Sequence, residues 1–113
     1  MSPQVWPVVP DDTGWITPTL TNGTSAGGGE TVQYRRRYGV VYIRGRWNKT
    51  SGGSVIFTFP TGFRPSVQMV YRLGNNTTTE IIVLRTTGVL EQATSANSSV
   101  LMLAEIPPFI AEA

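Results

Sequence analysis

Residues 39–47 read GVVYIRGRW and residues 54–59 read SVIFTF, and these two stretches decide the fold class. In the first stretch Val41, Ile43 and Trp47 share one parity, and most of the side chains between them are polar or charged. Such a period of two is typical of a β-strand with one buried face. The segment between the stretches is rich in Gly, Asn and Ser, which favours a hairpin loop. The region therefore predicts two adjacent antiparallel strands.

The rest of the chain repeats this pattern. Twelve glycines and eight prolines separate short runs rich in Val, Ile, Tyr, Phe and Thr. This spacing predicts an all-β protein, an antiparallel β-sandwich or barrel of about seven or eight short strands. The predicted strands are Trp15–Leu20, Thr31–Arg36, Gly39–Trp47, Ser54–Phe59, Ser66–Leu73, Glu80–Arg85, Val89–Gln92 and Ser99–Ile106.

The domain organisation is simple. The 113 residues fit one domain, which is long enough to bury a core without disulfides or metal. Three prolines at alternating spacing predict that residues 1–14 form an extended N-terminal arm. Residues 15–113 are then a single β head domain.

The composition excludes several classes of function. The chain has neither histidine nor cysteine, so it lacks the commonest general base and the commonest metal ligands. Its acids are scattered, and we predict no catalytic residues, no metal and no cofactor. A net charge of +2 is too small to indicate a nucleic-acid partner. No apolar run approaches the length of a membrane helix, and the first ten residues do not resemble a signal peptide.

Two predicted strands are apolar on both faces. In Glu80–Arg85 and Ser99–Ile106, apolar residues occupy both parities. A central strand covered by a long loop would explain this pattern, and so would a subunit interface. We favour the interface, because so short a chain has little else to cover these strands. The candidate interface residues are Ile82, Leu84, Leu101 and Leu103.

Three polar loops are candidate ligand-binding elements, because loops on a rigid scaffold often carry function. If the strands run up and down in order, Asn48–Gly53, Gly74–Thr79 and Ala93–Ser98 gather at one end. The candidate ligand-binding residues are Arg46, Trp47, Asn48, Arg72, Asn75, Asn76 and Thr77. Parity also places Trp47 in the core, so packing is its simpler interpretation.

A run of arginines is the densest charge in the chain. Arg35 and Arg37 share one face of a predicted strand, and Arg36 lies on the other. A solvated strand end is the ordinary interpretation, and binding of phosphates or sugar carboxylates is the functional one. Among the aromatic residues, Trp15 and Tyr42 are the least constrained by core parity.

The order of several motifs resembles the C-terminal receptor-binding head of phage tail-fibre and tail-tip proteins. In that family a "GW" pair, a strand ending in "YRR", a "V-x-L-R-G" strand and "IFTLPxGYRP" occur in this order. The matching segments here are Gly14–Trp15, Val32–Arg36, Gly39–Gly45 and Ile56–Pro65. This chain departs from the pattern with Phe59 for Leu and Phe63 for Tyr.

The resemblance implies a non-catalytic adhesion head at the tip of a phage tail or fibre, part of the virion and extracellular after host lysis. It implies a homotrimer that binds host cell-surface polysaccharide and contacts other tail or fibre proteins. The alternative is a purely structural virion component, such as a tip, plug or decoration protein. Because no shaft precedes the head in this sequence, we expect either a piece of a longer fibre or a small protein attached by its arm.

Overall fold

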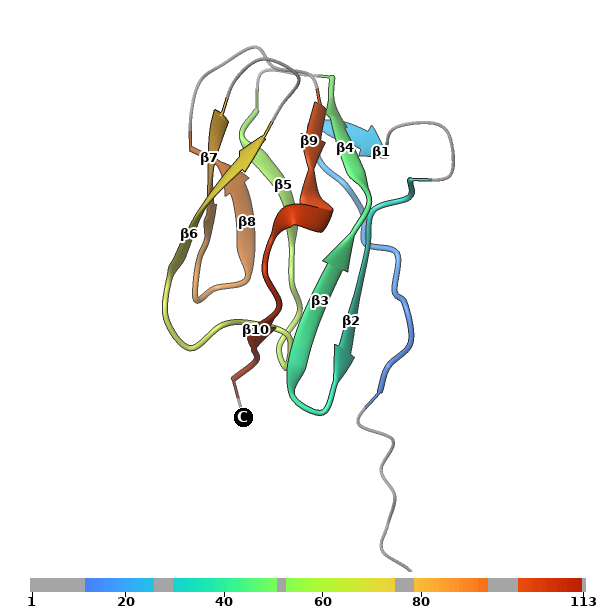
Figure 1. The fold of residues 1–113 in the computed structure, drawn as a ribbon, viewed down its shortest axis with the longest axis vertical. Helices are drawn as coiled ribbons and strands as arrows, with labels where there is room; N and C mark the ends of the chain where they lie inside the picture. The colour runs from blue at the N-terminus through green and yellow to red at the C-terminus, as the bar shows by residue number, and fades with distance from the viewer. Residues whose placement is uncertain (1–11, 26–29, 51–52, 75–78, 94–99, 113) are drawn as a thin grey trace, which may run out of the picture.

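The computed structural model describes residues 12–25, 30–50, 53–74, 79–93 and 100–112. They form an almost entirely β structure, as predicted (Figure 1). The elements are β1 (Gly23–Ser25), β2 (Gln33–Arg37), β3 (Val40–Arg44), β4 (Arg46–Lys49), β5 (Val55–Thr58), β6 (Met69–Gly74), β7 (Thr79–Leu84), β8 (Val89–Gln92), β9 (Val100–Met102), the 3₁₀ turn η1 (Leu103–Glu105) and β10 (Phe109–Ile110). In this described part of the chain, no helix is long and apolar enough to span a membrane.

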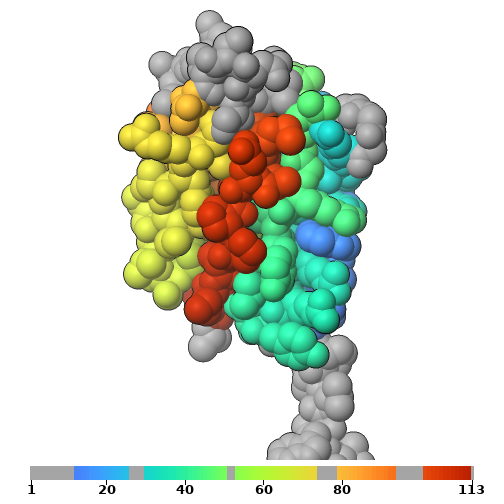
Figure 2. Space-filling view, viewed as in Figure 1, coloured from blue at the N-terminus to red at the C-terminus, as the bar shows by residue number. Residues whose placement is uncertain are grey.

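The strands form three antiparallel sheets. Their orders are β1-β4-β9, β10-β3-β2 and β5-β8-β7-β6. Because β3 runs almost directly into β4, the two three-stranded sheets lie end to end beside the four-stranded sheet (Figure 1). The C-terminal segment from β9 to β10 lies between β3 and β6 on the surface seen in Figure 2.

The core fills the space between these sheets. Trp47, Phe57 and Phe59 are its largest fully buried side chains. Tyr34 stacks on Phe57 with ring centroids 5.8 Å apart, and its ring meets Phe59 edge-on at 5.0 Å. Val41 is also buried, so the alternation in residues 39–47 does mark the inner face, as the sequence predicts.

The predicted strand Gly39–Trp47 is divided at Gly45. This residue has a φ of 102°, a region that favours glycine. A Cβ atom at this position would lie 2.3 Å from the carbonyl oxygen of Thr31. The glycine therefore allows both the close backbone approach and the change of direction that lets β3 and β4 join different sheets.

Three other boundaries differ from the prediction. Trp15–Leu20 is not a strand, and only Ile16 forms a bridge, to Tyr34. β1 lies outside all the predicted strands, and it pairs with β4. The predicted last strand shortens to β9, and the chain turns at η1 before β10 pairs with β3.

The four residues predicted at a subunit interface lie in the core of a single chain. The side chains of Ile82, Leu84, Leu101 and Leu103 are completely buried. β7 is an inner strand between β6 and β8, so its inner face is covered by this chain's own core. On its outer face Val83 is opposite Val70 on β6 and Glu91 on β8. The two-faced apolar pattern thus has an explanation within one chain, and these four side chains offer no surface to a second subunit.

Candidate functional site

The outer face of the β2–β3 hairpin carries a cluster of polar and aromatic side chains. Antiparallel pairing sets Gln33 opposite Arg44, Arg35 opposite Tyr42, and Arg37 opposite Val40. The alternate residues Tyr34, Val41 and Ile43 are buried, so these three pairs face outward. We call this surface the arginine face, made up of Asp12, Trp15, Gln33, Arg35, Arg37, Tyr42 and Arg44.

The segment before β2 supplies two members of the arginine face. Ile16 donates its backbone N–H to the Tyr34 carbonyl at 2.8 Å and accepts the Tyr34 N–H at 3.0 Å. Ile16 packs against the core, so its neighbour Trp15 lies on the side of the arginines. Asp12 bridges Arg37 further along β2. Together these pairings hold residues 12–16, which are not themselves a strand, alongside β2.

Arg44 lies over the ring of Trp15. Its guanidinium carbon lies 3.9 Å from the centre of the indole ring, within the range of a cation–π contact. The Nε and Nη2 atoms of Arg44 donate to Gln33 Oε1 at 3.0 and 2.5 Å. Gln33 Nε2 in turn donates to the Thr17 hydroxyl at 3.0 Å. The arginine therefore has a defined position although its side chain is exposed.

Arg35 forms an ion pair with Asp12. Its Nε donates to Oδ1 at 2.8 Å and its Nη2 donates to Oδ2 at 2.5 Å. Asp12 Oδ1 also accepts the Gly14 N–H at 2.9 Å. The hydrogen bonds from Arg35 and Gly14, with the charges of Arg35 and Arg37, hold the pKa of Asp12 well below its usual range. Asp12 is therefore ionised at neutral pH.

The hairpin tip places an aromatic ring in solvent beside a third arginine. Tyr38 and Gly39 both have positive φ, 51° and 77°, as a type I′ turn requires. Tyr38 is 75% exposed, and the guanidinium carbon of Arg37 lies 5.8 Å from its ring centre. A bulky residue in this conformation costs about 1–3 kcal/mol, and such strain is concentrated at functional sites. The ring of Tyr38 therefore lies next to the end of the arginine face at Arg37.

The face suits binding of a polar ligand. Aromatic rings with a polar edge pack against apolar ligand surfaces, while guanidinium groups donate in-plane hydrogen bonds. No group of three or more acidic side chains that could hold a metal occurs within the described ranges. The chemistry available there is hydrogen bonding, ion pairing and stacking.

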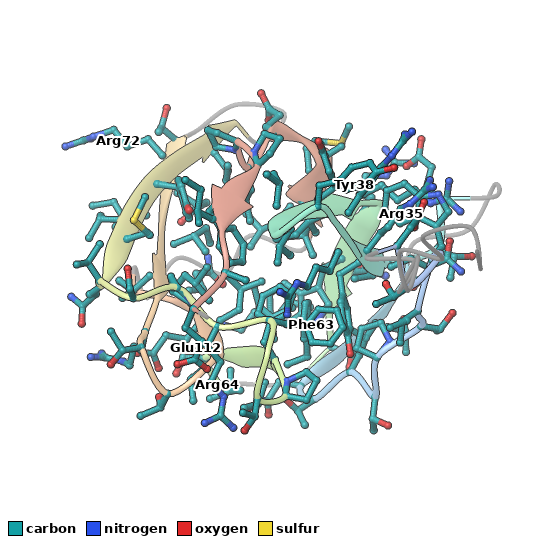
Figure 3. The ribbon with its side chains drawn as sticks, turned by 90° about the horizontal axis from the view of Figure 1, so that it is seen from below. Arg35, Tyr38, Phe63, Arg64, Arg72 and Glu112 are labelled. Carbon is teal, nitrogen blue, oxygen red and sulfur yellow. The ribbon has the colours of Figure 1, made fainter. Side chains whose placement is uncertain are left out.

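The four predicted ligand-binding residues that the structure describes, Arg46, Trp47, Asn48 and Arg72, do not form one exposed site. Trp47 is completely buried, so its ring cannot stack on a ligand. Arg46 forms an ion pair with Glu30, and Asn48 is half-buried between β1 and β9. Arg72 is exposed on β6, on the opposite side of the domain from Arg35 (Figure 3). The remaining three, Asn75, Asn76 and Thr77, lie outside the described residues.

The strand ends that flank the three candidate loops do lie at one end of the domain (Figure 1). Gly74 pairs with Thr79, Asn48 pairs with Val100, and the Gln92 N–H donates to the Ser54 carbonyl at 2.9 Å. At the other end the Phe59 N–H donates to the Gly88 carbonyl at 2.8 Å. The predicted pairing of the strand that ends at Trp47 with Ser54–Phe59 is wrong, however, because β4 pairs with β1 and β9 whereas β5 pairs with β8 in another sheet.

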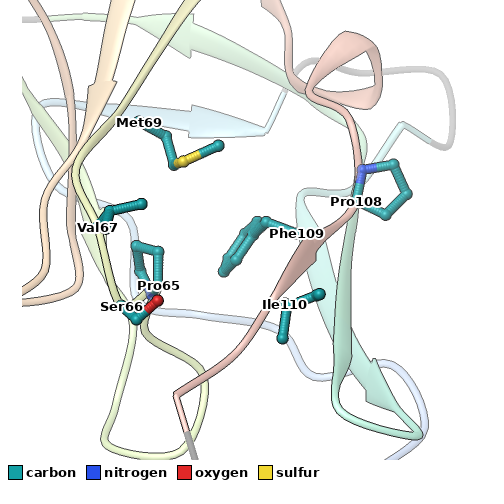
Figure 4. Close-up of a pocket in the computed structure, with 7 residues that line it drawn as sticks. All are labelled: Pro65, Ser66, Val67, Met69, Pro108, Phe109 and Ile110. Atoms are coloured by element: carbon teal, nitrogen blue, oxygen red, sulfur yellow. The ribbon is translucent and has the colours of Figure 1, made fainter.

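A pocket of about 300 Å³ opens between the four-stranded sheet and the sheet that contains β10 (Figure 4). It lies between the segment before β6 and β10, which are edge elements of different sheets. Val67 and Ile110 on its rim are 61% and 75% exposed. The lining is mostly apolar: Pro65, Ser66, Val67, Met69, Pro108, Phe109 and Ile110.

The sequence already contained part of the signal for the arginine face. The parity of Arg35 with Arg37, and of Tyr42 with Arg44, is visible in the predicted strands. The register that sets one pair beside the other, and the place of Trp15 on β2, come from the tertiary structure.

Comparison of the chain with protein-family models, with curated proteins and with solved structures gave no match.

Proposed function

We propose that this protein is a non-catalytic adhesion head of a phage tail fibre or tail tip, which binds saccharides on the host surface through the arginine face. The motif order in residues 14–65 supports the class of protein. The contact between Arg44 and Trp15, at 3.9 Å, is the observation that carries the binding site.

The arginine face has the properties that saccharide recognition requires. Sugar rings offer C–H surfaces that pack on aromatic rings and hydroxyl groups that exchange hydrogen bonds with polar side chains. Trp15, Tyr42 and Tyr38 supply rings along one side of the hairpin, and the arginines beside them supply donors. A rigid two-stranded platform keeps this set in place without closure of a lid.

We also propose that the head acts as a homotrimer in the virion, joined to other tail or fibre proteins. Three copies of one shallow site would raise a weak affinity by avidity without any new contact. The interface would use surfaces other than Ile82, Leu84, Leu101 and Leu103, because those side chains are buried.

The alternative is a purely structural virion part. The exposed apolar residues Val67, Val70 and Ile110, two of them beside the pocket, favour this function. Exposed apolar surface of this kind is typical of protein–protein contacts.

A glycan array with matched turnover assays tests the proposal. Host cell-wall and surface glycans are probed with the wild-type protein, with Trp15→Ala and with Arg72→Gln as a control on the opposite sheet. We expect binding without product release, a loss of at least ten-fold for Trp15→Ala, and no change for Arg72→Gln. Binding to no host glycan would favour the structural function, and released product would show an enzyme. Equal losses for both variants would place the site elsewhere.

A further inference from the structure

The arginine face has more positive than negative side chains among its described residues. From this we infer that the ligand is an acidic saccharide, and that Arg44 binds a sugar carboxylate beside Trp15. This inference rests on the proposed function and names the class of its ligand.

The three arginines of the face differ in how their charge is compensated. Arg35 is neutralised by Asp12, which it contacts through two hydrogen bonds. Arg44 is positioned by neutral groups alone, the Gln33 amide and the Trp15 ring. A glutamate in place of Gln33 would hold the same guanidinium and cancel its charge. Gln33 thus orients Arg44 and leaves its positive charge available for a ligand.

Arg37 is also poorly compensated. Its Nε lies 3.9 Å from Asp12 Oδ2, but both carboxylate oxygens of Asp12 already accept hydrogen bonds from Arg35. The Arg37 side chain is 54% exposed. Counted over its described members, three arginines and one aspartate give the arginine face a charge of about +2. The described part of this face is therefore positively charged.

The guanidinium group of Arg44 has a donor to spare. Arg44 uses Nε and Nη2 on Gln33, and its Nη1 donates to none of the described residues. A planar guanidinium donates in-plane hydrogen bonds to a carboxylate, and stacking on an aromatic ring does not consume those donors. Because Thr17, Gln33 and Trp15 already hold Arg44 in place, binding costs little side-chain entropy.

The separation of Arg44 and Arg37 suits an extended ligand. Arg44 and Arg37 belong to cross-strand pairs four residues apart along the hairpin, which is roughly 13 Å at the rise of a β-strand. Tyr42 lies between them. An oligosaccharide lying along the hairpin would meet a guanidinium at each end and an aromatic ring between them.

The test uses paired probes that differ only in charge. A panel of uronic-acid polysaccharides is compared with the carboxyl-reduced, neutral form of each, with sulfated polysaccharides and with single-stranded DNA. Affinity is measured by surface plasmon resonance at two salt concentrations. The proteins are the wild type, Arg44→Gln, Arg44→Lys and the control Arg72→Gln.

We expect at least one uronic-acid polysaccharide to bind ten-fold or more tightly than its reduced form, with a preference that shrinks as salt rises. Arg44→Gln should remove most of this preference, so that affinity for the acidic form falls at least ten-fold further than affinity for the reduced form. Arg44→Lys should restore it only in part, because an ammonium group lacks the planar pair of donors. Arg72→Gln should behave as the wild type.

Several outcomes would overturn the inference. If no acidic polysaccharide binds better than its reduced form, the ligand is not recognised by charge, although binding of neutral glycans would still support the adhesion function. Equal binding of DNA would show unspecific attraction of polyanions. A preference for sulfated over carboxylated sugars would show that the acidic group recognised by Arg44 is not a carboxylate. Absence of all glycan binding would refute the adhesion function as well.

Discussion

The guanidinium of Arg44, on β3, lies over the ring of Trp15, which precedes β2 in the chain, with 3.9 Å between the guanidinium carbon and the ring centre. This contact crosses β2 and joins an irregular segment to the hairpin. It determines where the positive charge of Arg44 lies on the arginine face.

A double-mutant cycle between Trp15→Ala and Arg44→Ala should reveal this contact as a coupling in stability. We expect a coupling free energy of about 0.5–1 kcal/mol, the usual value for an exposed cation–π pair. Urea unfolding of the four proteins measures it. The same cycle with Arg72→Ala in place of Arg44→Ala should give no coupling. A zero value for Trp15 and Arg44 would mean that the two side chains do not interact in solution.

The ion pair between Asp12 and Arg35 should make stability depend on pH. The pKa of Asp12 is lowered in the folded protein, so its contribution is complete above the unfolded pKa of about 3.9 and declines as the pH falls below that value. Asp12→Asn should therefore lower the melting temperature at pH 6, and the difference from wild type should shrink at pH 3. Thermal unfolding at several pH values measures this trend. A difference that stays constant with pH would show that the charge of Asp12 is not responsible.

Replacement of Tyr38 should raise the stability of the fold while it weakens adhesion. Tyr38 is the first residue of a turn with positive φ at both positions, for which Asn is the favoured residue. Tyr38→Asn should stabilise the fold by about 0.5–1 kcal/mol, because Asn adopts this conformation at lower cost.

The same variant should bind host glycan more weakly, because it removes an exposed ring beside Arg37. Denaturant unfolding and glycan binding are measured on the same preparation. Gly39→Ala is the matched control for the turn, and it should destabilise the protein through its positive φ. If Tyr38→Asn lowers stability, the turn is not strained at Tyr38; if binding is unchanged, the tip lies outside the site.

Truncation of the buried leucines should destabilise each chain independently of concentration. Leu101→Ala and Leu103→Ala remove side chains that are fully buried in one chain, and each should cost about 2–5 kcal/mol. The loss should be the same at low and high protein concentration. Melting temperatures at several concentrations, together with light scattering, measure this. A loss that disappears at high concentration would place these residues at a subunit interface.

The sequence predicted most of the strands because their alternation records which face is buried. Val41, Ile43 and Trp47 all lie in the core on the parity that the sequence indicates. The interface residues could not be predicted in this way, because alternation does not say whether a covering layer comes from the same chain or from another.

For the candidate site, too, alternation along the sequence does not tell which side chains come into contact. By itself the sequence determined an all-β fold, its main strands and the parity that Arg35 shares with Arg37 on one strand and that sets Arg44 apart from Val41 and Ile43 on the next. Only the tertiary structure decided that Trp15 lies against Arg44 and that Trp47 is buried. It also decided that Asp12 forms its ion pair with Arg35, so that no described acidic side chain compensates the charge of Arg44. Parity is a local property of extended backbone, whereas these contacts depend on cross-strand register and on the path of an irregular segment. Both are set by packing between residues far apart in the chain.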